Sequence, residues 1–227
     1  MFSNKLFKKY CSSEWMIIFE SNKQTINVKA KERIFNEGDE VKGIFFIEEG
    51  RVKVISTFNE GDQKILRVAG NDTILGHRGI NYKHYHISAE ALTDTRLTFL
   101  PIDIFIKILK ANPEMSIYLI NFLTEELREA EERLRNLLIL DPKKRVALIL
   151  LKLIDTFGYS KVQKNLLQYT LSRADMANMA GTTYETIIRT LSHFEDIKLI
   201  ELVGKKIAIK KEDKLRALAV DKKPAGK

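Results

Sequence analysis

The chain of 227 residues is 44% hydrophobic and 30% charged and has one cysteine, Cys11, which allows a buried core but excludes an internal disulfide and a multi-cysteine zinc or iron–sulfur site. The longest apolar run, residues 146–151, is far shorter than the roughly 20 residues that cross a bilayer, and the N-terminus lacks the apolar stretch of a signal peptide. The net charge of +8 is unevenly spread, because residues 1–141 hold 20 Lys and Arg against 21 Asp and Glu, whereas residues 142–227 hold 18 against 9. We therefore expect a cytoplasmic protein with no membrane segment, in which a domain that binds a polyanion follows a neutral one.

The first 111 residues predict a small antiparallel β-roll that acts as the sensor domain. After an amphipathic helical stretch, short strand patterns alternate with turn signals from about residue 28 to residue 100. In residues 51–55, for example, polar and apolar side chains alternate with the period of a strand. Pro101 ends this pattern.

Residues 112–140 predict one long helix. Its apolar side chains recur at alternating spacings of three and four, with charged residues between them, which is typical of a coiled-coil seam. The seam residues are Ile120, Leu123, Leu127, Ala130, Leu134 and Leu137. We interpret them as a homodimer interface; the alternative is that they pack against the chain's own sensor domain.

Asp141 and Pro142 mark the predicted start of the last domain, residues 141–227, because Asp is a good helix N-cap and Pro suits the first helical turn. Residues 158–169 read as a polar connector with little pattern. The lysine-rich tail, residues 221–227, is expected to be disordered.

Residues 171–191 predict two helices joined by a tight turn. Ser172 with Asp175, and Thr182 with Glu185, have the spacing of capping boxes, and Gly181 lies between the helices where the chain must turn. This is the pattern of a helix-turn-helix.

The second helix has the side chains needed to read bases. Glu185 is an acceptor suited to a cytosine amino group, and Arg189, one turn later, is a bidentate donor suited to guanine. The alternative is an ordinary Glu–Arg pair on a helix surface. The complete set of expected base-reading residues is Tyr184, Glu185, Ile188 and Arg189.

Residues 199–209 predict a β-hairpin with Gly204 at its turn, which would form the wing of a winged helix-turn-helix. Basic and hydroxyl side chains on the wing and at the helix starts are suited to phosphate contacts. The expected phosphate contacts are Ser172, Arg173, Thr183, Lys205 and Lys206.

These segments resemble the Crp-Fnr superfamily of bacterial regulators. The Glu-x-x-x-Arg pair of Glu185 and Arg189 matches the family's recognition helix, and residues 33–53, with Gly38 and Gly50 at turns, resemble the signature of its cyclic-nucleotide-binding β-roll. The resemblance runs from about residue 10 to residue 210 and implies an α+β fold: an antiparallel β-roll, a long dimerisation helix and a C-terminal winged helix-turn-helix. It also implies a transcription regulator that binds a pseudo-palindromic operator with TGA-like half-sites as a homodimer and has RNA polymerase as a partner.

The effector of the family does not carry over. Relatives that bind cyclic AMP use a Gly-Glu pair, a later Arg-Ser pair, and a Thr-Ser pair on the long helix, and this chain departs from all three. The positions that define the candidate effector pocket are Gly76, His77, Arg78, Tyr85, His86, Ala130 and Glu131. We expect an effector other than cyclic AMP, or a constitutive regulator with no effector.

Two other functions are compatible with parts of the sequence. A basic domain is also compatible with an architectural protein that binds DNA without sequence preference. An enzyme is the weakest interpretation, because the sequence has no phosphate loop, no G-x-S-x-G and no H-E-x-x-H motif. The loop histidines have no neighbouring cysteine, so we expect no metal site.

Overall fold

The structure, a computed structural model, describes residues 1–58 and 61–219. The chain divides into two units, residues 1–129 and residues 130–227. The tail at residues 221–227, expected to be disordered, lies outside the described residues. No helix in the described ranges is long and apolar enough to span a membrane.

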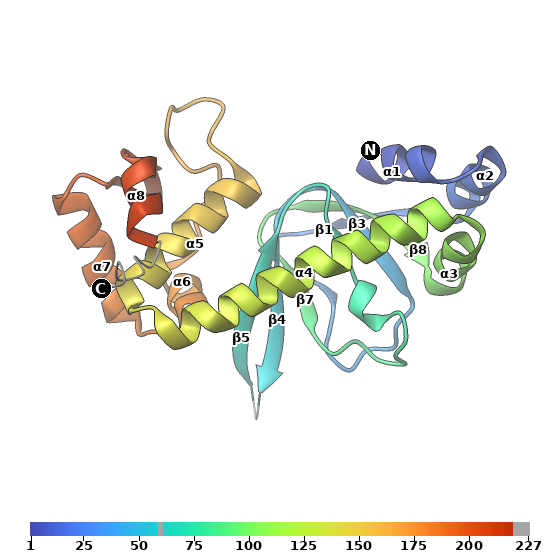
Figure 1. The fold of residues 1–227 in the computed structure, drawn as a ribbon, viewed down its shortest axis with the longest axis horizontal. Helices are drawn as coiled ribbons and strands as arrows, with labels where there is room; N and C mark the ends of the chain where they lie inside the picture. The colour runs from blue at the N-terminus through green and yellow to red at the C-terminus, as the bar shows by residue number, and fades with distance from the viewer. Residues whose placement is uncertain (59–60, 220–227) are drawn as a thin grey trace, which may run out of the picture. The chain divides into compact units, whose positions relative to one another are not determined.

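Two antiparallel sheets form the β-roll of the first unit (Figure 1), as the sequence predicted. In spatial order, the strands of one sheet are β1 (Gln24–Val28), β8 (Thr95–Pro101), β3 (Gly43–Glu49) and β6 (Ile74–Leu75). Those of the other are β2 (Arg33–Phe35), β7 (Ser88–Ala91), β4 (Val52–Phe58) and β5 (Asp62–Ala69).

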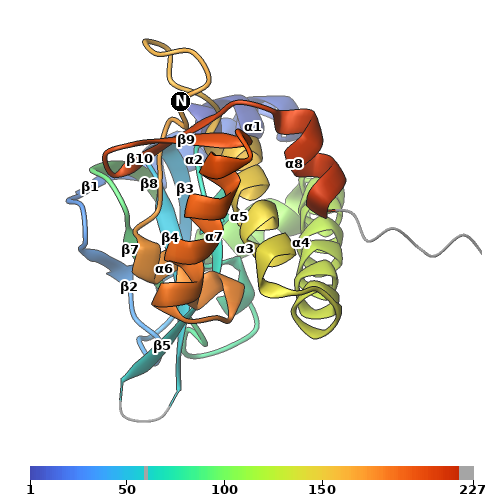
Figure 2. The ribbon, with the colours of Figure 1, turned by 90° about the vertical axis from the view of Figure 1, so that its left-hand side faces the viewer.

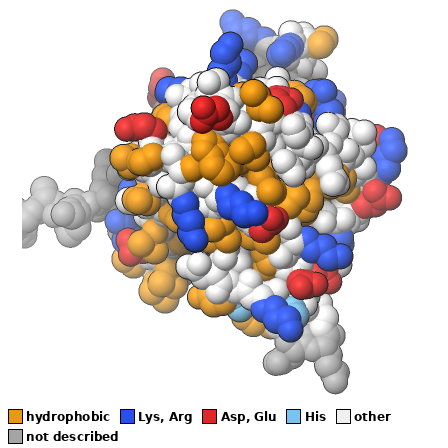
Figure 3. Space-filling view, turned by 90° about the vertical axis from the view of Figure 1, so that its right-hand side faces the viewer, with side chains coloured by type: hydrophobic (Ala, Val, Ile, Leu, Met, Phe, Trp, Pro, Cys, Tyr) orange, Lys and Arg blue, Asp and Glu red, His pale blue; other side chains and the backbone are white. Residues whose placement is uncertain are grey.

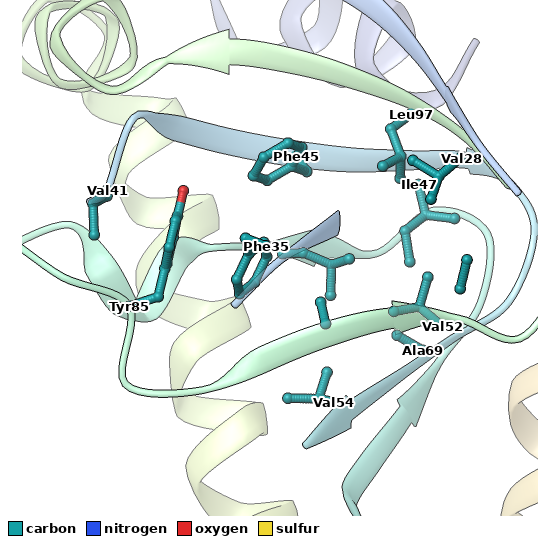
Figure 4. Packing of buried hydrophobic residues seen from close by; sticks show 13 residues of the cluster. Val28, Phe35, Val41, Phe45, Ile47, Val52, Val54, Ala69, Tyr85 and Leu97 are labelled. Carbon is teal, nitrogen blue, oxygen red and sulfur yellow. The ribbon is translucent and has the colours of Figure 1, made fainter. Parts of the chain in front are cut away.

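Strand β3 is buried on both faces, which explains its continuous apolar run. Side chains alternate between the faces of a strand. Phe45 and Ile47 belong to the core inside the roll, whereas Ile44 and Phe46 belong to a second core shared with helices. Inside the roll (Figure 4), the ring of Phe35 stacks on Phe45 with centroids 5.6 Å apart.

Gly50 is required at the turn after β3. Its φ of +130° is in the region that favours glycine, and a Cβ there would lie 2.3 Å from Oγ1 of Thr95. Any other residue would therefore be both strained and in collision with its neighbour.

Helices cover the outer face of the first sheet. They are α1 (Phe2–Tyr10), α2 (Ser13–Asn22), α3 (Ile102–Ala111) and the first half of α4 (Pro113–Ile139). The rings of Phe7 and Phe19 stack there with centroids 3.9 Å apart. Figure 3 views the molecule from the side of α2 and α3 and shows exposed hydrophobic side chains interspersed with charged ones.

Glu48 of β3 holds the start of α1. Its carboxylate accepts hydrogen bonds from the backbone N–H groups of Phe2 and Ser3, from the Ser3 hydroxyl, and from Oγ1 of Thr98 at 2.7 Å. Burial raises the pKa of Glu48, but the hydrogen bonds from Ser3, Thr98 and Phe2 outweigh it and lower the pKa below its usual value. The first helix is thus capped by a carboxylate from the sheet.

Replacing Glu48 with alanine is expected to lower the free energy of unfolding of the first unit by about 1–3 kcal/mol, because buried donors lose their acceptor. Trp15, the chain's one tryptophan, lies in α2, so its fluorescence during urea denaturation reports on this unit. The matched control is Glu49→Ala, which removes an exposed ion pair with Arg96 and should cost less than about 1 kcal/mol. Equal effects of the two variants would contradict the capping role.

Within the second unit, the predicted N-cap follows the end of α4. Asp141 accepts a hydrogen bond from the backbone N–H of Lys144 at 3.0 Å, with Pro142 in the first turn. The elements that follow are α5 (Pro142–Phe157), α6 (Arg173–Ala180), α7 (Tyr184–Asp196), β9 (Ile200–Val203), β10 (Lys206–Ile209) and α8 (Glu212–Ala219).

The connector at residues 158–169 has more structure than the sequence indicated. Leu166 and Leu167 are buried, and the backbone N–H of Leu167 donates to the carbonyl of Ile207 in β10 at 2.9 Å. The sequence carries no signal for the burial of these two leucines, because the residues before them are polar and set no period.

Candidate nucleic-acid interface

Helices α6 and α7 form the predicted helix-turn-helix, shown with the hairpin in Figure 2. Ser172 caps α6 as expected, accepting from the backbone N–H of Asp175 at 3.0 Å. The cap of α7, however, is Thr183 and not Thr182. The backbone N–H of Thr182 still donates to Ala177 at 3.1 Å in the C-terminal motif of α6, so α7 begins one residue later.

Helix α7 has a buried and an exposed face. Its buried side chains are Ile187, Thr190, Leu191 and Phe194. On the opposite face, Tyr184 is 52% exposed and Ile188 40% exposed, and Glu185 and Arg189 are also exposed. All four expected base-reading residues therefore lie on one open surface.

Glu185 and Arg189 remain available to a ligand. Arg189 Nη2 lies 3.4 Å from Oγ1 of Thr186, and among the described residues Glu185 and Arg189 form no ion pair with each other. A hydrogen bond from its own backbone N–H, followed by one from the Thr183 hydroxyl, lowers the pKa of Glu185, so the side chain is an ionised acceptor near neutral pH. An acceptor and a fork of donors are thus offered at the N-terminal end of α7.

The wing is the hairpin of β9 and β10, with Lys206 opposite Val203. Lys205 and Lys206 are exposed at its turn. Arg173 is only half-buried, and its Nη1 donates to the carbonyl of Lys205 at 3.4 Å, so it ties the start of α6 to the wing. Because Nη1 is used in this hydrogen bond, the expected phosphate contact of Arg173 would be made by another nitrogen of its guanidinium group.

The apolar seam of α4 is largely uncovered in the single chain. Leu127 and Leu134 are each 61% exposed, and Ile120 is 60% exposed. Leu123 and Leu137 are also exposed, and Ala130 is half-buried. Within the first unit, Ile120, Leu123 and Leu127 are therefore not covered by the β-roll.

A second stripe of α4 faces the β-roll. Met115 and Leu119 are buried in the core shared with the sheet, and Phe122 packs against it. The next position on that stripe is Glu126, whose side chain is 13% exposed. The stripe therefore passes from apolar contacts to a nearly buried carboxylate.

Glu126 is the centre of a charged cluster. Its Oε2 lies 3.3 Å from Nε of Arg67 and 3.2 Å from Nη2 of Arg78. The same oxygen lies 3.7 Å from Nε2 of His77, whose Nδ1 is 3.1 Å from the carbonyl of Ile74. The cluster joins β5, the short 3-10 helix His77–Gly79 and α4.

The charges of this cluster follow from its burial. Burial alone would raise the pKa of Glu126, but His77, Arg67 and Arg78 lower it to about 2. Burial also lowers the pKa of His77, so the permanent cations that face the carboxylate are Arg67 and Arg78. Glu126 is thus bound as an internal anion.

The other residues of the candidate effector pocket are distributed differently. Tyr85 is in the core of the roll, where its ring stacks on Phe35 at 4.2 Å and its hydroxyl donates to Gly43 at 2.7 Å. His86 is exposed beside the ring of Tyr82. Gly76 precedes the 3-10 helix with a φ of +80°, whereas Ala130 and Glu131 belong to the second unit.

Sequence reasoning missed Arg67 and Glu126. Glu126 does have a sequence signal, because it continues the helical spacing of Met115, Leu119 and Phe122. A carboxylate on a buried stripe must be paired with a cation. Arg67 had no comparable signal, since its partner comes from a helix far along the chain. Within the described residues, no group of three His, Cys, Asp or Glu side chains is arranged to hold a metal ion.

Two family models match the chain. The cyclic nucleotide-binding domain matches residues 25–112, and the Crp-like helix-turn-helix domain matches residues 144–218. The chain belongs to the Crp-Fnr superfamily. As a Crp-Fnr protein it is a transcription regulator with a helix-turn-helix that binds DNA.

Individual proteins agree with this assignment. Electron transport regulator A of Shewanella oneidensis is 28% identical over 194 residues, covering 85% of this chain and 77% of that protein. The fumarate and nitrate reduction regulatory protein of Yersinia pestis is 25% identical over 199 residues, covering 87% and 79%. The structure of FixK2 from Bradyrhizobium japonicum has the same fold, with a TM-score of 0.79 at 20% identity over 88% of this chain and 98% of that one.

Proposed function

We propose that this Crp-Fnr protein binds a pseudo-palindromic operator as a homodimer and reads each half-site with α7. The observation that carries the proposal is the exposure of Glu185 and Arg189 on one face of α7, without an ion pair between them. Because this pair matches the family's recognition helix, we expect TGA-like half-sites whose centres are about 10 bp apart. Tyr184 stands where cyclic-AMP-responsive relatives have an arginine, so the outer base preference differs.

The exposed seam of α4 supports the dimer. Two copies of the stripe from Ile120 to Leu137 would bury each other's leucines in a parallel pair and place two α7 helices about one two-fold axis. Ser172, Arg173, Thr183, Lys205 and Lys206 would contact phosphates and fix the register. RNA polymerase is the second expected partner.

We infer further that cyclic AMP is not the effector. Arg67 and Arg78 already hold the carboxylate of Glu126. His77 and Tyr85 stand where the cyclic AMP cassette has its glutamate and arginine. Because the Glu126 carboxylate already occupies these two cations, we infer that the protein binds its operator without a cyclic nucleotide. Adding cyclic AMP should leave the operator affinity unchanged.

Replacing Arg189 with alanine is expected to weaken operator binding by about 1–3 kcal/mol, or about 5- to 150-fold, and to change binding to random DNA little. The reason is that Arg189 would donate to a base edge, which random sequence offers only by chance. Fluorescence anisotropy with an operator duplex and a scrambled duplex measures both affinities.

Lys206→Ala is the matched control, because it removes one exposed cation from the wing. A phosphate contact contributes equally to every sequence, so both duplexes should weaken by a similar factor. If Arg189→Ala behaved like Lys206→Ala, the base-reading role of Arg189 would be wrong.

A further inference from the structure

Helix α4 ends without a basic residue of its own. Its last turn contains no Lys, Arg or His, although the final carbonyls of a helix lack intrahelical donors and form the negative end of its dipole. The donor comes from the next helix. Arg145 of α5 donates from Nη1 to the carbonyl of Leu140 at 2.8 Å and to that of Leu137 at 3.3 Å.

The same guanidinium also reaches the helix-turn-helix. Nη2 of Arg145 donates to the carbonyl of Gly181 at 3.3 Å. Gly181 ends α6 with a φ of +58°, and Thr183, two residues later, caps α7. One side chain thus joins the end of α4, the start of α5 and the turn before the recognition helix, which lie close together in Figure 1.

Packing reinforces this junction. A Cβ at Gly181 would lie 3.2 Å from Cδ2 of Leu137, so the turn lies directly against the last turn of α4. Among the described residues Arg145 forms no ion pair, and its Nε is buried without a hydrogen-bond partner. Its charge is therefore balanced by backbone carbonyls alone, which fixes the guanidinium between them and makes its geometry sensitive to any shift of the three segments.

The boundary between the two units is consistent with a fixed contact between the end of α4 and the helix-turn-helix. Residues 130–139 of α4 belong to the same unit as the helix-turn-helix, and not to the unit of the β-roll. The seam residues Leu134 and Leu137 lie in this segment. The C-terminal part of the seam is thus in the same unit as the helix that would enter DNA.

We propose that Arg145 is a positioning residue that fixes α7 to the C-terminal segment of α4 and so sets the half-site spacing that the dimer accepts. The role rests on the proposed function, because spacing has meaning only for a dimer on a two-part operator. In that dimer the paired α4 helices define the two-fold axis. The hydrogen bond from Arg145 to the carbonyl of Gly181 sets the distance and angle of each recognition helix from that axis. Each added base pair moves a half-site by about 3.4 Å along the duplex and rotates it by roughly a tenth of a turn.

The test measures the affinity of the full chain for duplexes whose TGA-type half-sites are separated by spacers that differ by single base pairs. The wild type is expected to prefer one spacer over its neighbours by about tenfold. Arg145→Ala should reduce that preference to about twofold, while its affinity for a duplex with a single half-site stays within about twofold of wild type. The matched control is Lys143→Ala, which removes an exposed cation from the same helical turn and should keep the spacer profile.

Circular dichroism first establishes that each variant folds. If Arg145→Ala does not fold, Arg145→Lys replaces it, because one ammonium keeps the charge but cannot bridge Leu140 and Gly181, and it too should flatten the profile. A variant that weakens all spacers by one common factor, with the preference intact, would overturn the role of Arg145 alone. A wild type that shows no spacer preference would overturn the two-part operator and this role together.

Discussion

Replacing Leu127 with lysine should turn the protein into a monomer at micromolar concentration and lower its affinity for the palindromic operator by about 100-fold or more. Leu127 is at the middle of the exposed seam of α4, 61% exposed in the single chain. In a parallel helix pair the same residue meets its copy across the two-fold axis, so the substitution would place two ammonium groups in a closed apolar contact. Each protomer would then bind one half-site alone.

Ile139→Lys provides the matched control. Ile139 is on the same helix and is 62% exposed, but its position in the heptad is opposite to the seam. The variant has the same added charge and loses an apolar side chain of the same size. Analytical ultracentrifugation should find Ile139→Lys dimeric and Leu127→Lys monomeric; two dimeric variants would place the interface elsewhere.

Replacing Glu126 with glutamine should destabilise the first unit by about 3 kcal/mol at pH 7. The amide keeps the shape of the side chain but removes the charge that Arg67 and Arg78 hold, and breaking a buried ion pair from one side leaves the other charge uncompensated. The same size follows from the pKa, which falls from 4.5 to about 2, since each pKa unit corresponds to about 1.4 kcal/mol. Urea denaturation followed by Trp15 fluorescence measures the loss.

The pH dependence has a definite sign. Because folding lowers the pKa of Glu126, its contribution to stability is present above about 4.5 and is lost as the pH falls toward about 2. The difference in unfolding free energy between wild type and Glu126→Gln should therefore shrink over that range. Glu125→Gln, which breaks an exposed pair with Arg128, should cost less than about 1 kcal/mol at every pH; a Glu126 difference that does not vary with pH would contradict the ion cluster.

Local patterns predicted much of the molecule correctly. The alternation and turn signals of the first hundred residues gave the antiparallel roll, and Asp141 and Ser172 were recognised as caps because capping depends on residues within one helical turn. The two faces of α7 were also legible, since Ile187, Leu191 and Phe194 recur at helical spacing. In each case the determinant and its partner are neighbours in sequence.

Long-range polar contacts were not predictable in the same way. Glu126 meets Arg67 and Arg78 only after the roll has folded, and Arg145 meets Gly181 only when α5 and the turn are brought together. The N-cap of α7 was expected one residue too early, at Thr182 and not at Thr183, because the backbone of Thr182 still belongs to the C-terminal motif of α6. The sequence does not show whether a basic or acidic side chain is solvated or forms a tertiary hydrogen bond or ion pair. Only the fold distinguishes the two.

We propose that this Crp-Fnr regulator recognises a two-part DNA sequence as a dimer. The deciding experiment titrates the full chain, at physiological salt, with a palindrome of TGA-type half-sites and with a scrambled duplex of equal length and composition. One dimer is expected to bind each palindrome, with an affinity at least about 1,000-fold higher than for the scrambled duplex. Equal affinity for the two duplexes would contradict it and would indicate an architectural protein that binds DNA without regard to sequence.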